Sequence, residues 1–341
     1  MAIGRPLARE SGIILINKPR GMTSFGVVSR LRKLTGIRRI GHTGTLDPFA
    51  EGLLPVCTGR ATAAVQFMDG YDKTYRLGIE FGRATDTQDL TGSTVYERQP
   101  NDAEQQELVR TSFAALDDAV AELPGEHQQL PPMYSAVKID GRKLYEYARK
   151  GQSVERKARP ISIYSATVED VFLDNGVFRA ILQISCSKGT YIRTIADELG
   201  KTLQFGAHAH SLTRLRCGPF RLEQAVDLAQ LEIWRSECPD QSAFIDFLQE
   251  KGLLLPIDSA FAEFPAVSLP EDAAIRLING QPLLMAADGL SLAGWPPAGV
   301  RTVVYSRDCL IAVGSILETE NGDFQFKTER VLIDLADFRQ S

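Results

Sequence analysis

The fold is indicated most clearly by ISIYSATVEDVFLDNGVFRAILQISCS, residues 161–187. Two runs in this segment are rich in apolar and β-branched residues, which is typical of strands. Asp174-Asn175-Gly176 separates the two runs, and this sequence favours a tight turn. We therefore expect two neighbouring strands joined as a hairpin.

More strands are expected on the N-terminal side. In TYRLGIEFG, residues 74–82, every second residue is apolar, so Tyr75 lies on the apolar face of a strand. SGIILIN, residues 11–17, is a short apolar run that ends at a proline turn. This pattern is typical of a buried strand.

Several segments have the periodicity of helices. Apolar residues recur at helical spacing after Thr23 and Ser24, either of which can cap a helix. We predict further helices over residues 102–123 and 222–254, and one that begins near Thr190. After Pro256 the runs become short and strand-like, which predicts a small β-rich second domain.

Composition excludes several classes of protein. The chain is 44% hydrophobic and 24% charged, as a globular protein is. It contains no apolar run near 18 residues, so we expect no membrane span and no membrane partner. The N-terminus lacks the apolar core of a secretory signal, and the five cysteines lack zinc-site spacing. We therefore expect a cytoplasmic protein without a metal.

Charge is distributed unevenly along the chain. The net charge of −5 argues weakly against a nucleic-acid partner. However, residues 30–39 hold five basic side chains and no acid, and residues 138–159 hold eight basic side chains against three acids. The segment 125–159 is long, polar and basic, so we interpret it as an inserted arm rather than core. Either a basic binding face or an ordinary solvated surface explains these clusters.

The loop GHTGTLDPFAEG, residues 41–52, places Asp47 among glycines and a proline. Asp47 can cap a helix that begins at Pro48, which is the commonest use of this pair. A phosphate-binding loop is disfavoured because the segment contains no lysine. Asp47 can also be a nucleophile if the fold holds it ionised and exposed.

Arg193 is a second unusual residue. Near a helix N-terminus its charge opposes the helix dipole, which suggests a partner carboxylate. Asp197, one turn later, is the simplest such partner. Asp86 and Asp89 are the nearest pair of carboxylates to a metal site, but their Gly- and Thr-rich context favours a turn.

Five motifs, taken together, closely resemble the tRNA pseudouridine-55 synthase family of the TruB type. The resemblance covers most of residues 11–220, and the block around Asp47 is its most specific part. The tail, with Ala274-Ile275-Arg276 and Asn279-Gly280-Gln281, resembles more loosely the family's C-terminal RNA-binding barrel of the PUA class. The five motifs are Lys18-Pro19-x-Gly21-Met22-Thr23-Ser24, Gly41-His42-Thr43-Gly44-Thr45-Leu46-Asp47-Pro48, Lys73-x-Tyr75, Tyr134-Ser135-Ala136-Val137-Lys138 and Cys186-Ser187-Lys188-Gly189-Thr190-Tyr191-Ile192-Arg193.

The resemblance implies an activity and a set of site residues. The family converts one uridine in the T-loop of tRNA to pseudouridine without a cofactor. Asp47 matches the essential carboxylate, Tyr75 the tyrosine that stacks on the target base, and Arg193 the arginine that pairs with the carboxylate. The remaining matches are RNA-binding or pocket residues, namely Lys18, His42, Tyr191 and Leu212, to which the basic arm adds Lys138, Arg142 and Lys143.

The resemblance also implies the architecture. We expect an α+β fold with a mixed, mainly antiparallel sheet flanked by helices and a small C-terminal PUA-like β-barrel. Residues 1–255 would form the catalytic domain with its arm near 125–159, and residues 256–341 the RNA-binding domain. We expect a monomer whose partner is the tRNA T-arm. Alternatives are a non-catalytic tRNA-binding or folding protein and a synthase that acts on another RNA.

Overall fold

The computed structural model describes residues 9–174, 176–285 and 289–340. Its largest element is a ten-stranded mixed sheet. The strands of this sheet are β1 (Gly12–Lys18), β2 (Ile40–His42), β3 (Glu51–Thr58), β4 (Lys73–Phe81), β7 (Gly125–Gln129), β10 (Arg159–Asp174), β11 (Val177–Cys186), β12 (Ala207–Cys217), β13 (Phe220–Arg221) and β14 (Val226–Asp227).

The sheet has the mixed, mainly antiparallel character that was predicted. Its main path runs β14-β1-β3-β12-β4-β11-β10-β7, with β2 beside β3 and β13 beside β12. The pairs β1–β14 and β3–β12 are parallel, and the other pairs are antiparallel. The hairpin of β10 and β11 and the strand around Tyr75 are confirmed. Asn175 in the predicted turn lies outside the described residues.

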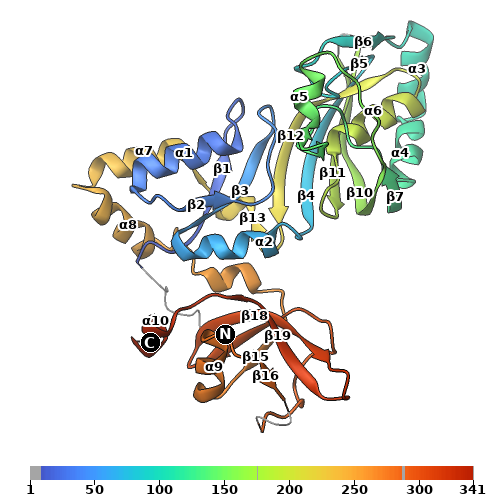
Figure 1. Cartoon of the computed structure of the whole chain (residues 1–341). Helices are drawn as coiled ribbons and strands as arrows, with labels where there is room; N and C mark the ends of the chain where they lie inside the picture. Colours follow the sequence, from blue (N-terminus) through green and yellow to red (C-terminus); the bar gives the residue numbers. More distant parts are fainter. Residues whose placement is uncertain (1–8, 175, 286–288, 341) are drawn as a thin grey trace.

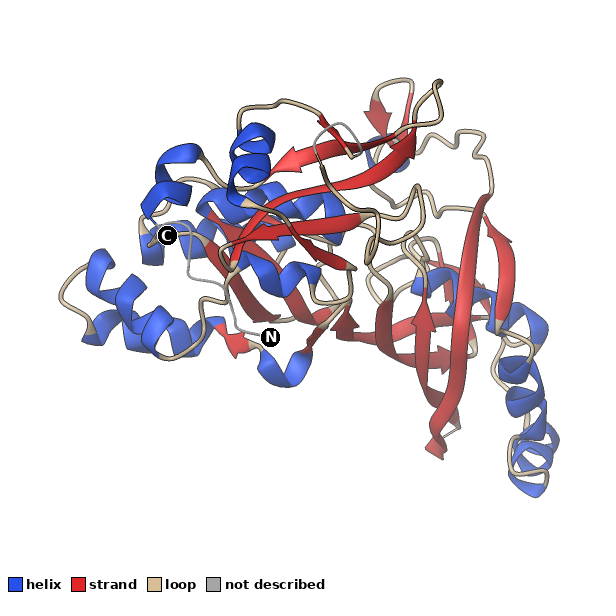
Figure 2. Ribbon diagram, turned by 90° about the horizontal axis from the view of Figure 1, so that it is seen from below, coloured by secondary structure: helices blue, strands red, loops and turns tan. Residues whose placement is uncertain are grey.

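Helices pack near both ends of the sheet (Figure 1). α1 (Ser24–Thr35), α7 (Leu228–Glu237) and α8 (Gln241–Glu250) share one apolar core with β1 and β3. α4 (Ala114–Ala121) and α6 (Ile192–Thr202) share another with β4, β11 and β12. Seen from below, the strands run between these groups of helices (Figure 2). The sheet therefore positions residues from distant parts of the sequence.

Two helix predictions need correction. The single helix predicted over residues 102–123 is wrong, because α3 (Asp102–Arg110) ends before α4 begins. Ser112 and Phe113 between them have φ angles of 52° and 62°, which a continuous α-helix does not allow. The segment 222–254 is also interrupted, since β14 and a 3₁₀ turn over Leu222–Gln224 precede α7.

The basic segment 125–159 is only partly an arm. Its first residues form β7, the last strand of the main path, which pairs with β10. The remainder carries the short hairpin of β8 (Lys138–Ile139) and β9 (Arg142–Lys143), followed by α5 (Leu144–Ala148). A separate hairpin of β5 (Arg83–Thr85) and β6 (Thr94–Glu97) follows β4.

A second sheet confirms the predicted β-rich tail. It has five strands in the order β15-β17-β18-β19-β16, and it lies below the main sheet in Figure 1. Apolar residues of both sheets, including Leu53 of β3 and Val313 of β18, form a shared core. The elements of the tail are β15 (Ala266–Ser268), α9 (Glu271–Ile278), β16 (Leu283–Leu284), β17 (Thr302–Ser306), β18 (Cys309–Glu318), β19 (Phe324–Val331) and α10 (Leu335–Gln340).

The connection between the sheets contains a short 3₁₀ helix, Ile257–Phe261, and α2 (Val65–Met68) packs nearby in the shared core. Within the described part of the chain, no helix combines the length and apolarity that crossing a bilayer requires. The RNA-binding role expected for residues 256–341 and the division at residue 256 stay predictions.

Candidate active site

Asp47 lies in a loop between β2 and β3, and no helix follows it. The Ala50 amide donates to the Asp47 carbonyl at 3.2 Å in a tight turn, and β3 begins at Glu51. The interpretation of Asp47 as a helix cap is therefore wrong. The loop is instead anchored to α1, because the Ser24 hydroxyl donates to the Leu46 carbonyl at 3.1 Å and accepts from the Leu46 amide at 2.9 Å.

Lys18 on β1 contacts the loop that contains Asp47. Its side chain is completely buried, and its ammonium donates to the Met22 carbonyl at 2.6 Å and to the Pro48 carbonyl at 3.5 Å. Burial lowers the pKa of Lys18 to about 8. The RNA contact predicted for Lys18 stays a prediction, and the contacts that this structure shows for its ammonium are to backbone carbonyls. Lys18 thus holds the backbone beside Asp47.

The partner of Asp47 is Arg193, as the resemblance implied. The Arg193 Nε atom lies 2.8 Å from the Asp47 carboxylate. Arg193 is the second residue of α6. Its side chain is only 4% exposed, whereas that of Asp47 is 40% exposed. The alternative pairing with Asp197 is wrong, because Asp197 binds Lys201 at 2.6 Å.

Arg193 is fixed by three further acceptors. Its Nη1 donates to the Thr87 carbonyl at 2.6 Å and lies 3.4 Å from the Asp89 carboxylate. Its Nη2 donates to the Tyr134 carbonyl at 2.8 Å. A guanidinium held by four acceptors in different directions has one orientation, so the position of the Asp47 carboxylate is fixed as well. Asp89 also accepts from Thr91 within its turn, so the predicted turn is present.

Asp47 sits where two electrostatic effects oppose each other. Burial raises the pKa of Asp47, while the charge of Arg193 and its hydrogen bond lower it, and Asp89 adds a further upward push. The net direction is upward. The exposed part of this carboxylate therefore faces a low-dielectric pocket rather than open water. A carboxylate so placed is weakly solvated, which favours its use as a nucleophile or base.

The pocket beside Asp47 has a volume of about 280 Å³. Tyr75 on β4 and Leu212 on β12 form part of its wall, and these strands pair directly. Tyr191, at the start of α6, lines it too. Burial raises the pKa of Tyr75 to about 12, so its phenol is neutral at physiological pH. One aromatic and one aliphatic side chain thus border the pocket that contains the carboxylate.

Two cations in this pocket were not predicted. Arg214 is fully buried, and it donates from Nε to the Leu53 carbonyl at 2.7 Å and from Nη1 to the Gly44 carbonyl at 2.8 Å. Its Nη2 is buried and has no hydrogen-bond partner among the residues that the structure describes. Lys73 is also buried and donates to the Tyr71 carbonyl. The signal for Arg214 was its spacing, since it follows Leu212 by two residues and so shares its strand face.

A groove of about 690 Å³ leads to the same carboxylate. His42 and the N-terminus of α1 line it, together with Lys143, Tyr145 and Arg149 of the basic arm. Lys138 and Arg142 are exposed on the β8–β9 hairpin but do not line the groove. The sequence-predicted residues are therefore brought together around Asp47, except for Lys138 and Arg142.

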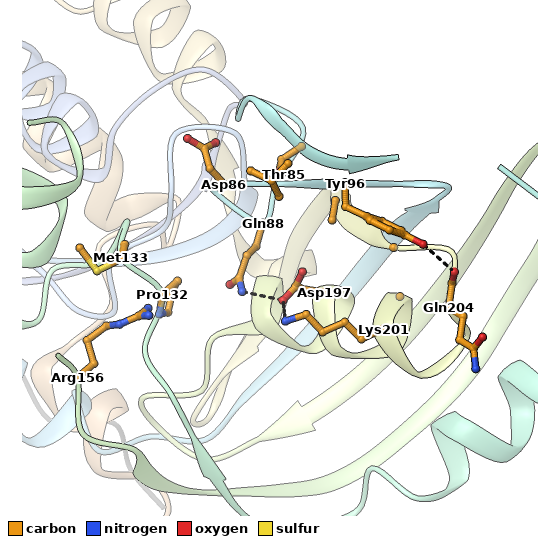
Figure 3. A pocket seen from close by; sticks show the side chains of 14 residues that line it. Thr85, Asp86, Gln88, Tyr96, Pro132, Met133, Arg156, Asp197, Lys201 and Gln204 are labelled. Atoms are coloured by element: carbon orange, nitrogen blue, oxygen red, sulfur yellow. Dashed lines mark hydrogen bonds and ion pairs between the residues drawn. The ribbon is translucent and has the colours of Figure 1, made fainter. Parts of the chain in front are cut away.

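A cavity of about 740 Å³ is a separate feature (Figure 3). It lies between α6 and the β5–β6 hairpin, and neither Asp47 nor Tyr75 lines it. Asp197 is held there by Gln88 and Lys201 (Figure 3). Asp86 is the one described residue that lines both this cavity and the groove. The chemistry that the structure supports therefore lies in the smaller pocket.

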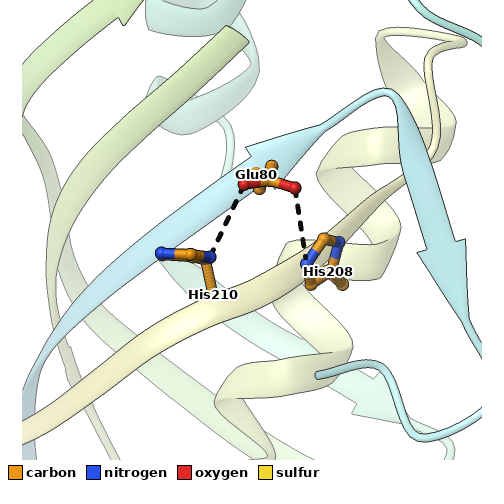
Figure 4. Close-up of side chains that lie close together, drawn as sticks. All are labelled: Glu80, His208 and His210. Atoms are coloured by element: carbon orange, nitrogen blue, oxygen red, sulfur yellow. Dashed lines mark ion pairs between the residues drawn. The ribbon is translucent and has the colours of Figure 1, made fainter. Parts of the chain in front are cut away.

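One group of described residues has the composition of a metal site. Glu80, His208 and His210 converge from β4 and β12 (Figure 4), with nitrogen–oxygen distances of 3.9 Å and 3.5 Å. However, Arg179 donates twice to Glu80, at 2.9 Å and 2.7 Å, and Arg83 lies 3.3 Å from the His208 Nε2 atom. Guanidinium groups thus occupy the ligand atoms, and their charge opposes a divalent cation.

Comparison with known proteins identifies the family. Residues 32–192 match the TruB family pseudouridylate synthase N-terminal domain, and residues 193–262 match the tRNA pseudouridylate synthase B C-terminal domain. The tRNA pseudouridine synthase B of Halalkalibacterium halodurans is 41% identical over 271 residues, which are 79% of this chain and 84% of the relative. The chain belongs to the TruB family of pseudouridine synthases.

Other comparisons agree with this membership. The tRNA pseudouridine synthase B of Sodalis glossinidius is 42% identical over 288 residues, covering 84% of this TruB-family chain and 87% of the relative. A chain in the crystal structure of a Cbf5-Nop10-Gar1 complex shares the fold, with a TM-score of 0.70 at 22% identity. That match covers 99% of this chain and 91% of the other. The expected fold class and enzyme family are confirmed.

Proposed function

We propose that this TruB-family enzyme converts uridine 55 in the T-loop of tRNA to pseudouridine, with Asp47 as the nucleophile. The C1′–N1 bond of the target breaks, the base turns, and a C1′–C5 bond forms. C5 loses its proton and N1 gains one, so the reaction needs no oxidant and no external group. The observation that carries the proposal is the Asp47 carboxylate, bound by a buried Arg193 and open to a pocket.

The pocket supports base flipping as part of this proposal. A base within a folded loop must leave its stack before Asp47 can reach the sugar or the ring, at a cost of a few kcal/mol. Stacking on an aromatic side chain returns about 1–3 kcal/mol per base. Tyr75 supplies such a ring beside Leu212 and within the same pocket as Asp47.

The groove supports RNA as the partner. His42 lines it next to the Asp47 loop, and burial lowers the pKa of His42, so the ring is neutral at pH 7. We infer that this neutral ring contacts the T-loop. Lys143 and Arg149 also line the groove, and Lys138 and Arg142 belong to the same basic arm. These cations would contact phosphates, because A-form RNA is recognised largely through its shape and backbone.

The test is release of tritium from unmodified tRNA that carries 5-³H-uridine, followed by mapping of the modified position. The wild type should release tritium from a single site at position 55, and Asp47→Asn should release none while it still binds the tRNA. If both proteins bind tRNA and neither releases tritium, the chain is a tRNA-binding or folding protein. Release from another RNA, but not from tRNA, would assign a different substrate.

A further inference from the structure

Phe25 is an exposed aromatic residue at the entrance to the active site. Its side chain is 64% exposed, although it stands between residues of α1 that are buried. It lines the same groove as Asp47 and His42. Exposing this much apolar surface is unfavourable in water, and no core position on α1 requires the ring. The chemistry proposed for Asp47 does not account for this exposed ring.

The position of Phe25 relative to Asp47 is fixed by the backbone. Thr23 caps α1 through its hydroxyl, which accepts from the Gly26 amide at 2.9 Å. Ser24 exchanges two hydrogen bonds with Leu46, the residue before Asp47. Phe25 follows Ser24 directly, so its ring is attached to the rigid point where α1 and the catalytic loop join.

One face of the Phe25 ring is in contact with a cation. The Arg32 guanidinium lies 5.9 Å from the centre of the Phe25 ring, and its Nη2 donates to the Ile40 carbonyl at 3.1 Å. This bond limits the movement of Arg32 beneath the ring. An aromatic ring that is backed by a cation and otherwise exposed is a suitable surface for a second planar group.

The charges of the groove favour a nucleic-acid base as that group. Lys143 and Arg149 line the same groove and lie 5.5 Å and 5.2 Å from the centre of the Tyr145 ring. Their charges suit a phosphate backbone that follows the groove. Of the acids in the groove, Asp47 and Asp89 are paired with Arg193, and Asp86 accepts from the Ser93 amide.

We propose that Phe25 is a stacking platform for an unpaired base of the RNA substrate, next to the base that enters the catalytic pocket. This inference rests on the proposed function and adds a contact outside the pocket. Stacking on Phe25 requires an aromatic ring and involves no charge. Unlike a phosphate contact, it should therefore not contribute to the salt dependence of binding. These properties define the experiment.

The experiment measures binding of a T-arm stem-loop RNA in which one loop base at a time is replaced by the fluorescent base 2-aminopurine. Wild type should quench the probe at one loop position beside the target. Phe25→Ala should abolish that quenching and weaken binding about five- to 150-fold, the range of base–aromatic stacking. The slope of log Kd against log salt should stay unchanged, because no phosphate contact is lost.

Three variants make the test specific. Phe25→Trp should keep the quenching and the affinity, whereas Phe25→Leu should lose both, because leucine keeps apolar area without a π-face. Ile233→Ala on α7, where the side chain is 52% exposed outside the groove, is the control and should bind as wild type. Wild-type affinity for Phe25→Ala, or full affinity and quenching for Phe25→Leu, would overturn the platform.

Pseudouridine formation by the wild type on the same RNA is measured in parallel. If the wild type converts the RNA and Phe25→Ala binds equally well, the platform alone is wrong. If the wild type neither binds nor converts the RNA, the proposed function and the platform both fail. A reduced salt slope for Phe25→Ala would also overturn the inference, since it would assign a lost phosphate contact.

Discussion

Two clusters of oppositely charged side chains lie on opposite faces of the same strand, β4. On one side, Asp47 meets Arg193 beside Tyr75, and on the other side Glu80 meets Arg179 and two histidines. Tyr75 and Glu80 face opposite sides of the strand because successive side chains alternate. Both clusters contain a carboxylate and a guanidinium, yet only one lies in a pocket that can hold a substrate.

The difference lies in which partner is buried. Arg193 is 4% exposed and Asp47 40%, whereas Arg179 is 33% exposed and Glu80 18%. Burial pushes the pKa of Glu80 upward, but the hydrogen bonds and charge of Arg179 more than offset this, and the pKa lies below its ordinary value. The pKa of Asp47 moves the other way. A buried cation leaves its carboxylate available, while a covered carboxylate only stabilises the sheet.

The largest expected effect separates the two carboxylates. Asp47→Asn should lower the single-turnover rate by about 10⁴-fold or more, as loss of a nucleophile does, with RNA affinity within a few-fold. Glu80→Gln is the matched control and should stay within about threefold of wild type. An equal loss in Glu80→Gln would show that the two clusters are not functionally distinct.

The next largest effect should be a difference in kcat between variants of the two arginines. Arg193→Lys should reduce kcat by about 100- to 1,000-fold, because lysine cannot serve Asp47, Thr87 and Tyr134 at once. Arg179→Lys removes a partly exposed pair and should change kcat by less than about threefold. Steady-state kinetics on unmodified tRNA measures both. Similar kcat values for the two variants would contradict the role assigned to burial.

The exposed cations of the basic arm form a third class. Replacing Arg142, Lys143, Arg149 and Lys150 together with glutamine should weaken tRNA binding and reduce the salt slope by about three units, since each phosphate contact contributes 0.7–0.9. The value of kcat should not change, because none of the four contacts Asp47. Arg110→Gln on α3, where the side chain is ion paired with Glu107, is the control. An unchanged slope would exclude the arm as a phosphate clamp.

The raised pKa of Asp47 predicts a pH profile. Only the ionised carboxylate attacks, so kcat should fall about tenfold per pH unit below the Asp47 pKa. Because burial raises this pKa, the fall should begin at a pH above the ordinary aspartate value of about 3.9. Arg193→Lys should move the midpoint further upward, since a hydrogen bond that favours the ionised form is weakened. A midpoint below the ordinary value would contradict the assigned effect of burial.

The smallest effect concerns stability at the second cluster. His208 has no exposed surface, and burial lowers its pKa from the ordinary value near 6.5. Below about pH 6.5, His208 therefore binds a proton in the unfolded chain but not in the folded chain. The free energy of unfolding decreases as the pH falls. The loss approaches about 1.4 kcal/mol per pH unit until the folded pKa is reached. Urea unfolding of His208→Gln between pH 7 and 5.5 should show a flatter dependence than wild type.

Local patterns predicted the elements and part of the site. Alternation placed Tyr75 on the apolar face of a strand, and the unfavourable position of Arg193 near a helix start predicted a carboxylate partner. These signals arise within a few residues and depend on backbone geometry alone. The choice of Asp47 over Asp197 was different, because it came from family resemblance and not from local physics.

Tertiary contacts explain what the sequence did not predict. The Lys18 ammonium donates to the distant Pro48 carbonyl as well as to nearby carbonyls, and buried Arg214 donates to the carbonyls of Leu53 and Gly44. Asp89 was correctly placed in a turn, but its contact with Arg193 joins segments 104 residues apart. The helix break at Phe113 followed no glycine or proline. Partners of this kind appear only when the strands have been ordered in the sheet.

The pairing of β12 with β4 also governs how the enzyme is made. The pocket wall needs Tyr75 from an early strand and Leu212 from a late one, so a growing chain cannot complete the site until β12 has left the ribosome. At 5–20 residues per second, this delay after synthesis of the Asp47 loop is roughly 10–30 s. Until then, the edge of β4 that pairs with β12 has no strand partner, although β11 on the other edge is synthesised earlier. Asp47, Tyr75 and Arg193 are therefore all synthesised before the wall to which Leu212 belongs, and the pocket is completed only when β12 pairs with β4.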